Sequence, residues 1–398
     1  MKDLQKMSPV ELKSCSILAS VYALRMLGMF LILPIFAIYA TNLDSNPTSL
    51  QIGLALGIYG LTQAIFQIPF GMSSDYFGRK KVIYFGLLLF IIGSLIAGHS
   101  TSIEGIILGR SIQGSGAISA VLTALLADIT REEQRTKAMA IIGASIGLTF
   151  ALSLVLSPWL NDVIGVDGIF ILMAILSFTA FLLVYFFIKE PEIRKEKAKT
   201  SADEFFKILK DINLFRMNFG IFVLHATQIS MFMIIPIYLV NQGGINLSDH
   251  WQIYLPILFF SFLLMIPIII FSEKFNKIKL AFLSAIIILF LAQLVFIIFG
   301  HSLVGIILAL LIYFVGFNFL EASLPSLVSK IAPINKKGLA LGVYNTSQSL
   351  GIFVGGALGG LITNVYGYNA SFIFCIALIF LWFVLSLGMQ VANYKKAN

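Results

Sequence analysis

The residues best suited to chemistry are charged or titratable side chains that lie inside long apolar segments. Four stand out: Glu321, Arg25, Arg110 and His225. A charge surrounded by hydrocarbon costs about 2.5–3.5 kcal/mol on membrane-insertion scales, so it persists mainly where it is paired or functional. A carboxyl at such a depth can load and release a proton or hold a cation, and imidazole changes charge near neutral pH. We therefore expect proton coupling or cation binding at Glu321, with Arg25 and His225 as further candidates.

Each of these side chains also has a purely structural interpretation. Glu321 can remain permanently protonated and make one structural hydrogen bond. Arg25 and Arg110 can cap backbone carbonyl groups, and His225 can be a core residue with satisfied hydrogen bonds. The sequence alone leaves both interpretations open.

Polar and aromatic residues near these charges are candidates for a substrate cavity. Asn318 lies one helical turn before Glu321 on the same face, and Gln113 lies one turn after Arg110. Pro325 has no N–H to donate to the carbonyl of Glu321, four residues earlier. An adaptable apolar pocket would add aromatic and Met side chains, and our candidates are Tyr39, Tyr59, Phe66, Met231 and Tyr313.

A short polar segment carries the most specific motif, Gly71-x3-Asp75-x2-Gly78-Arg79. The two glycines permit the tight backbone geometry that such a short connection needs. Asp75 can accept hydrogen bonds from the N-terminus of another helix. Arg79 can pair with Asp128, which ends a later apolar segment. The simpler interpretation, ordinary positive charge beside a membrane, does not account for the glycines.

The elements that must position these residues are membrane-spanning helices. Hydrophobic residues make up 59% of the chain and charged residues only 12%, too little charge to cover a soluble protein of this length. Apolar runs of about 20 residues, the length needed to cross a bilayer, recur throughout. We predict an all-α integral membrane protein with twelve transmembrane helices, at 14–40, 50–74, 81–98, 102–127, 137–160, 165–188, 216–240, 250–272, 279–299, 302–329, 338–364 and 368–391.

Basic residues alternate along this series of spans. The polar segments before span 1 and after spans 2, 4, 6, 8, 10 and 12 contain 25 of the 27 lysines and arginines. The intervening segments carry acidic residues such as Asp44 and Asp162 instead. By the positive-inside rule, both termini are cytoplasmic. The net charge of +8 is therefore a topology signal and a contact with membrane lipid, and it gives no reason to expect nucleic-acid binding.

The two halves of the chain are related in sequence. Residues 29–35 and 231–237 share five identities in seven at an offset of 202. Residues 74–81 resemble 272–279 at an offset of 198, and 125–129 resemble 327–331 at 202. We predict two pseudo-symmetric six-helix bundles, 1–188 and 216–398. The cytoplasmic linker 189–215 is predicted to contain a helix on the membrane surface, a flexible charged tether being the alternative.

These motifs resemble those of one transporter family. The segment 71–80 is similar to the signature loop of the major facilitator superfamily. Span 4, from Leu108 through Arg110 and Gln113 to Gly116, resembles the second motif of its proton-coupled members. Ser157-Pro158 is loosely similar to the Gly-Pro motif of drug antiporters. Residues 24–30 and 57–71 resemble the YajR group of bacterial proton-driven drug exporters, and the resemblance covers nearly the whole chain.

The resemblance implies a secondary transporter of the bacterial inner membrane that alternates access between its bundles. It would work as a monomer and export amphiphilic or drug-like compounds in exchange for protons. The five residues Gly71, Asp75, Gly78, Arg79 and Asp128 would form a conformational latch in the outward-open state, with Asp75 facing the start of span 11. Arg110 would tune a proton site or the cavity. Tyr76 departs from the family pattern, which usually has a basic residue there.

Two alternatives remain at this point. A proton-coupled symporter or exporter of a sugar or other small metabolite would share the fold. A membrane enzyme should show a cluster of His, Asp or Cys at one membrane face, which the sequence lacks. There is also no metal-ligand spacing and no nucleotide-binding loop. We therefore expect neither catalysis nor a metal nor a cofactor.

Overall fold

A computed structural model describes residues 7–43, 46–131, 134–190, 202–333 and 336–389. These residues form helices and connecting turns, and none of them lies in a strand. The chain divides into two compact units, Met1–Pro47 with Leu54–Ala198 and Thr48–Gly53 with Lys199–Asn398.

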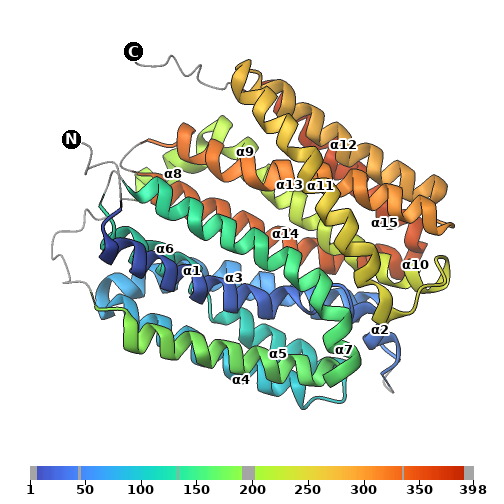
Figure 1. Cartoon of the computed structure of the whole chain (residues 1–398), viewed down its shortest axis with the longest axis horizontal. Helices are drawn as coiled ribbons and strands as arrows, with labels where there is room; N and C mark the ends of the chain where they lie inside the picture. The colour runs from blue at the N-terminus through green and yellow to red at the C-terminus, as the bar shows by residue number, and fades with distance from the viewer. Residues whose placement is uncertain (1–6, 44–45, 132–133, 191–201, 334–335, 390–398) are drawn as a thin grey trace. The chain divides into compact units, whose positions relative to one another are not determined.

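The helices of the first unit pack mainly along their lengths. One long helix, α7, packs against both α1 and α4, and α4 also packs against α5 (Figure 1). The helices are α1 Pro9–Phe30, α2 Phe36–Thr41, α3 Ser49–Phe77, α4 Arg79–Gly98, α5 Ile103–Ser115, α6 Ser119–Ile129 and α7 Arg135–Phe187.

The second unit has the corresponding set, preceded by a short helix in the linker. Within it, α14 packs along α9, and α12 packs against α13 and α15. The helices are α8 Ala202–Lys210, α9 Ile212–Phe232, α10 Ile235–Asn241, α11 Trp251–Lys274, α12 Ile278–Phe299, α13 Leu303–Ile331, α14 Lys337–Tyr366 and α15 Tyr368–Leu387, with a 3-10 turn at Leu247–Asp249.

Twelve membrane crossings follow from these helices, as the sequence predicts. Ten segments among the described residues are long and apolar enough to span a bilayer. The longest of them contains two crossings, because α7 kinks at Gly165, whose φ of 69° and ψ of 174° are not helical. α1 with α2 supplies the remaining crossing, its mean hydropathy being lowered by Lys13 and Arg25. The polar connection expected at 161–164 is wrong: these residues are helical, and the chain turns at Gly165.

The first span of each unit is broken at the same place. α1 ends at Phe30 and α2 begins at Phe36, and Pro34 lies between them. In the second unit α9 ends at Phe232, and α10 begins at Ile235 with Pro236 in its first turn. Proline lacks the N–H that a helix interior needs, so both breaks follow from the repeated residues.

The linker contains the predicted helix, α8, while residues 191–201 lie outside the described part. Phe206 and Leu209 of α8 are exposed, and Lys207 and Lys210 lie in its last turn. The placement of this helix on a membrane surface stays a prediction.

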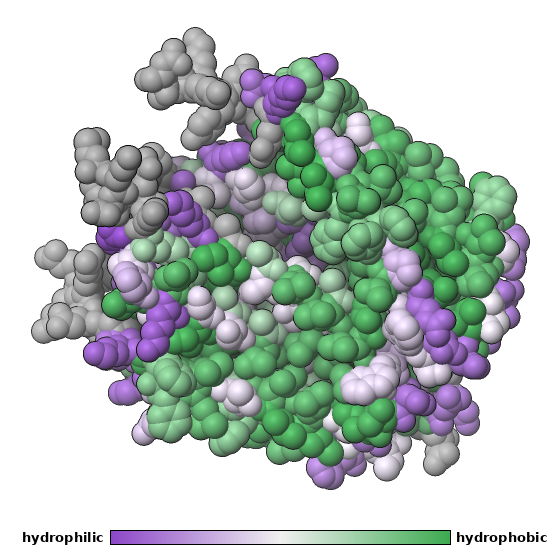
Figure 2. All heavy atoms as spheres, viewed as in Figure 1, coloured by the Kyte–Doolittle hydropathy of each residue, from purple (hydrophilic) through white to green (hydrophobic). Residues whose placement is uncertain are grey.

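Exposed hydrophobic side chains are abundant elsewhere too. On the face shown in Figure 2, hydrophobic residues cover the middle and hydrophilic residues gather toward the two sides. Large apolar residues such as Phe85 and Ile92 of α4 and Ile270 of α11 are about half exposed. Such surfaces are stable when lipid is the solvent.

A glycine stripe on α14 brings this helix close to α9. A Cβ added at Gly351 would lie 2.3 Å from the carbonyl oxygen of Phe222, and one at Gly355 would lie 2.3 Å from that of Ala226. A Cβ at Gly359 would lie 2.5 Å from a side-chain oxygen one turn further along α9. The four-residue spacing of small residues therefore serves helix packing.

Replacing Gly355 by Leu should destabilise the second unit, because the backbone of α9 cannot move away from a new side chain cheaply. Overpacking of this kind costs about 1–3 kcal/mol. The measurement is the thermal unfolding midpoint of the purified protein in detergent. Gly342→Leu is the matched control on the same helix, because nothing lies within 4 Å of a Cβ there. Equal unfolding midpoints for the two variants would contradict the packing argument.

Candidate functional site

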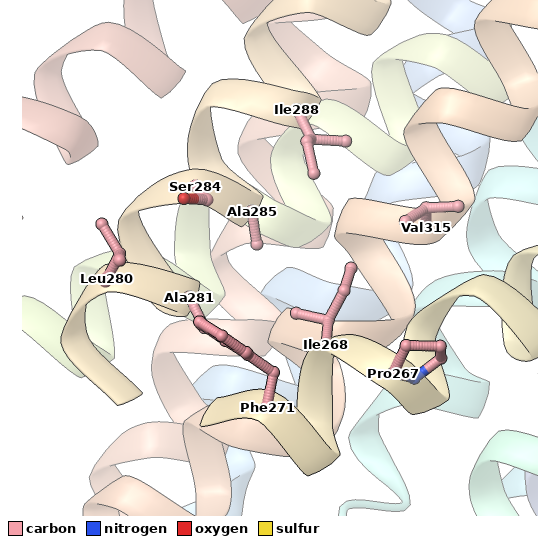
Figure 3. Close-up of a pocket in the computed structure, with 9 residues that line it drawn as sticks. All are labelled: Pro267, Ile268, Phe271, Leu280, Ala281, Ser284, Ala285, Ile288 and Val315. Atoms are coloured by element: carbon pink, nitrogen blue, oxygen red, sulfur yellow. The ribbon is translucent and has the colours of Figure 1, made fainter. Parts of the chain in front are cut away.

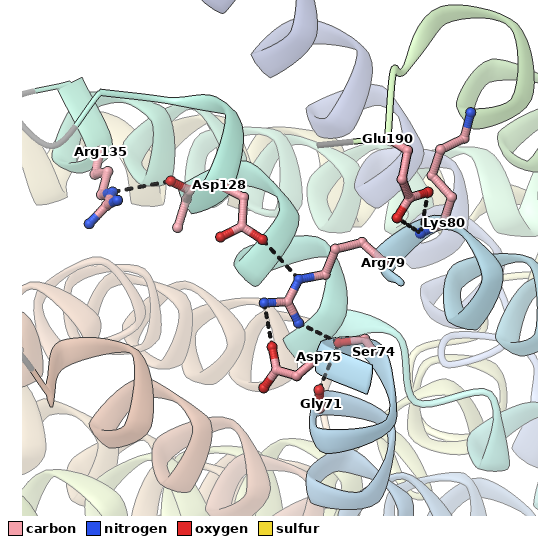
Figure 4. A network of polar contacts seen from close by, with 9 residues as sticks. Gly71, Ser74, Asp75, Arg79, Lys80, Asp128, Arg135 and Glu190 are labelled. Carbon is pink, nitrogen blue, oxygen red and sulfur yellow. Dashed lines mark hydrogen bonds and ion pairs between the residues drawn. The ribbon is translucent and has the colours of Figure 1, made fainter. Parts of the chain in front are cut away.

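The loop between α3 and α4 is organised around one buried guanidinium, that of Arg79 (Figure 4). Its Nη2 lies 2.6 Å from Oδ1 of Asp75, and its Nε lies 2.9 Å from Oδ2 of Asp128 on α6. Nη1 donates to the hydroxyl of Ser74, which in turn donates to the carbonyl of Gly71. The planar donor set of arginine suits such a three-way contact. The structure thus joins three of the predicted loop residues directly and a fourth, Gly71, through Ser74.

Two features of the structure favour glycine at the fifth predicted residue, Gly78. Its φ of +99° lies in the left-handed region, and an added Cβ would lie 3.0 Å from Oε1 of Glu190. That carboxylate accepts from the backbone N–H of Lys80 at the start of α4, at 3.3 Å. The ammonium of Lys80 in turn donates to the carbonyl of Ile188 just after α7, at 2.7 Å. The loop is therefore tied to the end of α7 by reciprocal capping.

A second ion pair lies at the same end of the first unit. Glu11, in the first turn of α1, is buried and accepts from the backbone N–H of Ser8 at 2.8 Å. It also accepts from the backbone N–H and the Nη2 of Arg131, both at 2.9 Å. The guanidinium of Arg131 is the main cause that lowers the pKa of Glu11 from 4.5 to about 2. This pair fixes the start of α1 to the segment that follows α6.

Arg25 is fully buried, and its guanidinium donates hydrogen bonds to uncharged hydroxyl and carbonyl oxygens. Its Nη1 donates to Ser119 at 2.8 Å, and its Nη2 donates to the hydroxyl of Tyr59 at 3.0 Å and to the carbonyl of Gly116 at 2.9 Å. Residues 116–118 interrupt the helix between α5 and α6, so the carbonyl of Gly116 is available to an outside donor. No described carboxylate lies within 4 Å of this guanidinium.

The positive charge of Arg110 is also stabilised by uncharged groups. It donates to the carbonyl oxygens of Ala55 and Leu56 on α3, at 3.3 and 3.4 Å, and to Oε1 of Gln113 at 3.2 Å. Its guanidinium lies 5.1 Å from the ring centroid of Tyr59, a cation–π contact. Tyr59 thus contacts both buried arginines, one through its hydroxyl and the other through its ring.

In the second unit the predicted acid and the predicted histidine meet. Nε2 of His225 on α9 lies 3.3 Å from Oε2 of Glu321 on α13. Nδ1 of His225 lies 2.9 Å from Oε1 of Gln228, and Nε2 lies 2.6 Å from the amide nitrogen of Gln348 on α14. The His225 side chain is 5% exposed and that of Glu321 is 32% exposed. The imidazole is therefore buried inside the unit, whereas part of the Glu321 side chain lies at its surface.

Comparison with known proteins identifies the family of this chain. The family model of the major facilitator superfamily matches residues 18–356 and 322–397. The chain belongs to the major facilitator superfamily. The inner membrane transport protein YajR of Escherichia coli is 40% identical over 394 residues, which cover 98% of this chain and 86% of that protein. The chain is therefore a multi-pass membrane transporter and not an enzyme.

Two more distant comparisons agree with this assignment. Multidrug resistance protein 1 of Bacillus subtilis is 25% identical over 384 residues, which cover 94% of this chain and 95% of that protein. The crystal structure of a bacterial homolog of the human lysosomal transporter Spinster, inward-facing and occupied, has a TM-score of 0.76 at 12% identity. It covers 96% of this chain and 97% of that one. At this identity the likeness shows the major facilitator fold alone.

The predicted cavity residues of this transporter have different environments. Tyr59, Gln113, Met231 and Tyr313 are fully buried inside their units, and Gln113 donates to Ser94 at 2.8 Å. Asn318 donates to Ser261 at 2.9 Å, Tyr39 donates to Asp167 at 2.8 Å, and Phe66 is 39% exposed. Their contribution to a substrate cavity stays a prediction.

Several polar partners escaped the sequence analysis. Glu11 had a local signal, because Ser8-Pro-Val-Glu11 is a capping-box pattern and the structure forms it. The sequence signal for Gln228 and Gln348 was weaker: both are amide side chains inside otherwise apolar spans. The contact between Lys80 and Glu190 had no signal in the sequence, because it joins residues 110 positions apart.

The Glu11 pair predicts an acid-sensitive contribution to stability. Because the pKa of Glu11 is lower in the folded protein, its contribution is fully present above pH 4.5 and is lost as the pH falls through about 2. Glu11→Gln should therefore lower the thermal unfolding midpoint at pH 7, and its difference from wild type should shrink between pH 4.5 and pH 2. Arg131→Gln should show the same pattern. A pH-independent difference would rule out the pair as its source.

Proposed function

We propose that this transporter couples the movement of protons to the export of amphiphilic or drug-like compounds by alternating access. The observation that carries the proposal is the contact of Glu321 with His225, between two amide side chains. It joins α9, α13 and α14, so a change of its charge acts on three spans at once.

The hydrogen bonds of His225 support a two-state proton site. A neutral imidazole can donate from Nδ1 to Gln228 and accept at Nε2 from the amide of Gln348. A second proton on the ring turns Nε2 into a donor, which then suits the carboxylate of Glu321. Proton uptake therefore replaces a contact with α14 by an ion pair with α13.

Groups around this pair are consistent with reversible charging. The phenols of Tyr313 and Tyr344 lie near enough to Glu321 to interact with its charge, and Phe317 lies edge-on to the imidazole with ring centroids 6.1 Å apart. Proton loading of Glu321 and binding of a cationic compound to its carboxylate would exclude each other, which is the requirement for exchange.

The buried arginines are proposed to act as fixed charges. Both Nη atoms of Arg25 donate to carbonyl or hydroxyl oxygens, and Arg110 donates to carbonyl and amide oxygens and lies against the ring of Tyr59. A cation held without a counter-ion raises the local potential and resists the entry of a second cation or a proton. We propose that Arg110 tunes the proton site or the cavity in this way.

Several features favour an exporter of amphiphilic cargo. The predicted cavity residues are mostly aromatic or apolar, which suits lipophilic compounds. The Bacillus subtilis relative is a multidrug resistance protein. We further propose that the basic helix ends face the cytoplasm and that the chain lies in a bacterial inner membrane, as the name of the Escherichia coli relative states for that protein. A carrier of sugars or small metabolites is the alternative.

The network of Arg79 is proposed to be a conformational latch. Arg79 binds both Asp75 and Asp128, so the loop and α6 move together while the contacts last. Asp75 is about half exposed and Arg79 is buried, so Asp75 is the member that another group can capture. Losing one contact would shift a two-state equilibrium without touching substrate.

Glu321→Gln should abolish transport driven by a pH gradient, because the amide cannot carry a proton. The measurement is uptake of cationic dyes and of sugars into proteoliposomes with and without an imposed gradient. Glu104→Gln, in the first turn of α5, removes a carboxylate elsewhere and should leave transport intact. Gradient-driven transport by Glu321→Gln equal to that of wild type would defeat proton coupling at this site.

Asp75→Asn should reduce transport to background while expression and the unfolding midpoint stay near wild type. The reason is that the amide keeps the size of Asp75 but loses its charge contact with Arg79. Transport and membrane abundance are measured on the same vesicles. Normal transport by this variant would exclude the latch.

A further inference from the structure

The second unit contains an apolar cavity that the proposed function does not use (Figure 3). Its volume is about 390 Å³, within the range of small-ligand pockets. It lies between α11, α12 and α13, and its side chains are apolar except for Ser284. Two of them, Phe271 and Leu280, are 44% and 53% exposed, so the cavity opens at the surface of the unit. The lining residues are Pro267, Ile268, Phe271, Leu280, Ala281, Ser284, Ala285, Ile288 and Val315.

The turn between α11 and α12 places a lysine at the rim of this cavity. Asn276 has a φ of 52°, in the left-handed region, and the N–H of Lys277 bonds back to the carbonyl of Ser272 at 2.9 Å. This closure is typical of helix C-termini. It brings the ammonium of Lys277 to 5.8 Å from the ring centroid of Phe271, a lining residue. The rim is therefore cationic directly beside the apolar lining.

The internal repeat shows what is unusual about this lysine. At the offset of 198, Lys277 corresponds to Arg79, and Asn276 corresponds to Gly78, which also has a positive φ. One partner of Arg79 is Asp128, whose counterpart at the offset of 202 is Lys330, and the other is Asp75, whose counterpart at the offset of 198 is Glu273. The second unit thus keeps the turn, the cation and the acid that precedes it, but has a lysine in the place of Asp128.

Two further lysines flank the same turn. Lys274 ends α11, and Lys279 lies in the first turn of α12, and both are exposed like Lys277. No described carboxylate lies within 4 Å of any of the three ammonium groups. Together they form a basic rim, which we define as Lys274, Lys277 and Lys279.

We propose that the cavity and the basic rim form a binding site for one anionic phospholipid of the leaflet at this end of the helices. An acyl chain would enter between α11, α12 and α13, and the phosphate would bind the basic rim. Basic pockets between membrane-spanning helices recognise anionic headgroups in this manner. A cationic amphiphile is disfavoured by the rim, and a sugar is disfavoured by the apolar lining. The proposal does not depend on the direction or the cargo of transport.

The test measures lipid binding by purified protein in detergent. Phosphatidylglycerol or phosphatidylcholine is titrated, and bound lipid is counted by native mass spectrometry together with the thermal unfolding midpoint. Wild type should bind one phosphatidylglycerol preferentially and be stabilised by it. Ser284→Phe fills the cavity and should abolish this binding. Lys277→Gln should weaken phosphatidylglycerol binding about fivefold, the factor expected for about 1 kcal/mol per basic residue, and leave phosphatidylcholine unchanged.

Two matched controls separate the site from general effects. Ile287→Phe adds an aromatic ring at a 44% exposed position of α12 that does not line the cavity, and Lys210→Gln removes the same charge from α8. Both should bind phosphatidylglycerol as wild type does. The proposal is overturned if Ser284→Phe retains the lipid or if Lys210→Gln loses as much affinity as Lys277→Gln. Lys277 lies on the surface, so its variant decides the question even if Ser284→Phe does not fold.

Discussion

Hydrocarbon cannot donate or accept hydrogen bonds, so a charge buried inside this transporter depends on partners within the protein. Arg25 shows how far this constraint shapes the fold. Its guanidinium needs acceptors at the level of Ser119, and the interruption between α5 and α6 frees the carbonyl of Gly116 there. The corresponding span of the second unit, α13, is continuous. The broken helix therefore supplies a carbonyl acceptor to the buried guanidinium, and the guanidinium supplies a donor to that carbonyl.

The same pair of spans holds a polar centre in each unit, but the groups that form it differ. In the first unit the span containing Arg25 contacts Ser119. In the second unit the span containing His225 contacts Glu321, which corresponds to Ser119 at the offset of 202. One centre has a permanent cation and a neutral partner, whereas the other has two titratable groups. Because arginine stays protonated, we propose that only the second centre changes its charge.

Sequence reasoning succeeded where the physics is local or periodic. Span length and the contact of Arg79 with Asp128 followed from residue type and spacing. The breaks near Pro34 and Pro236 were not predicted, because spans 14–40 and 216–240 were expected to be continuous. Sequence reasoning failed at Gly165, because a sharp kink and a short loop give similar hydropathy patterns. It also missed the contact of His225 with Gln348, 123 positions away. Such contacts depend on how helices are rotated against one another, which a single sequence does not contain.

The acidic residues explain why the halves need not behave alike. Asp128 and Ser119 lie nine positions apart on one span, and their counterparts are Lys330 and Glu321. The anion thus lies at the end of the span in the first unit and in its interior in the second. At the end it closes an ion-pair network within the protein. In the interior we propose that it exchanges a proton, and at the end of the second unit Lys330 takes the place of Asp128 while Glu273 keeps that of Asp75.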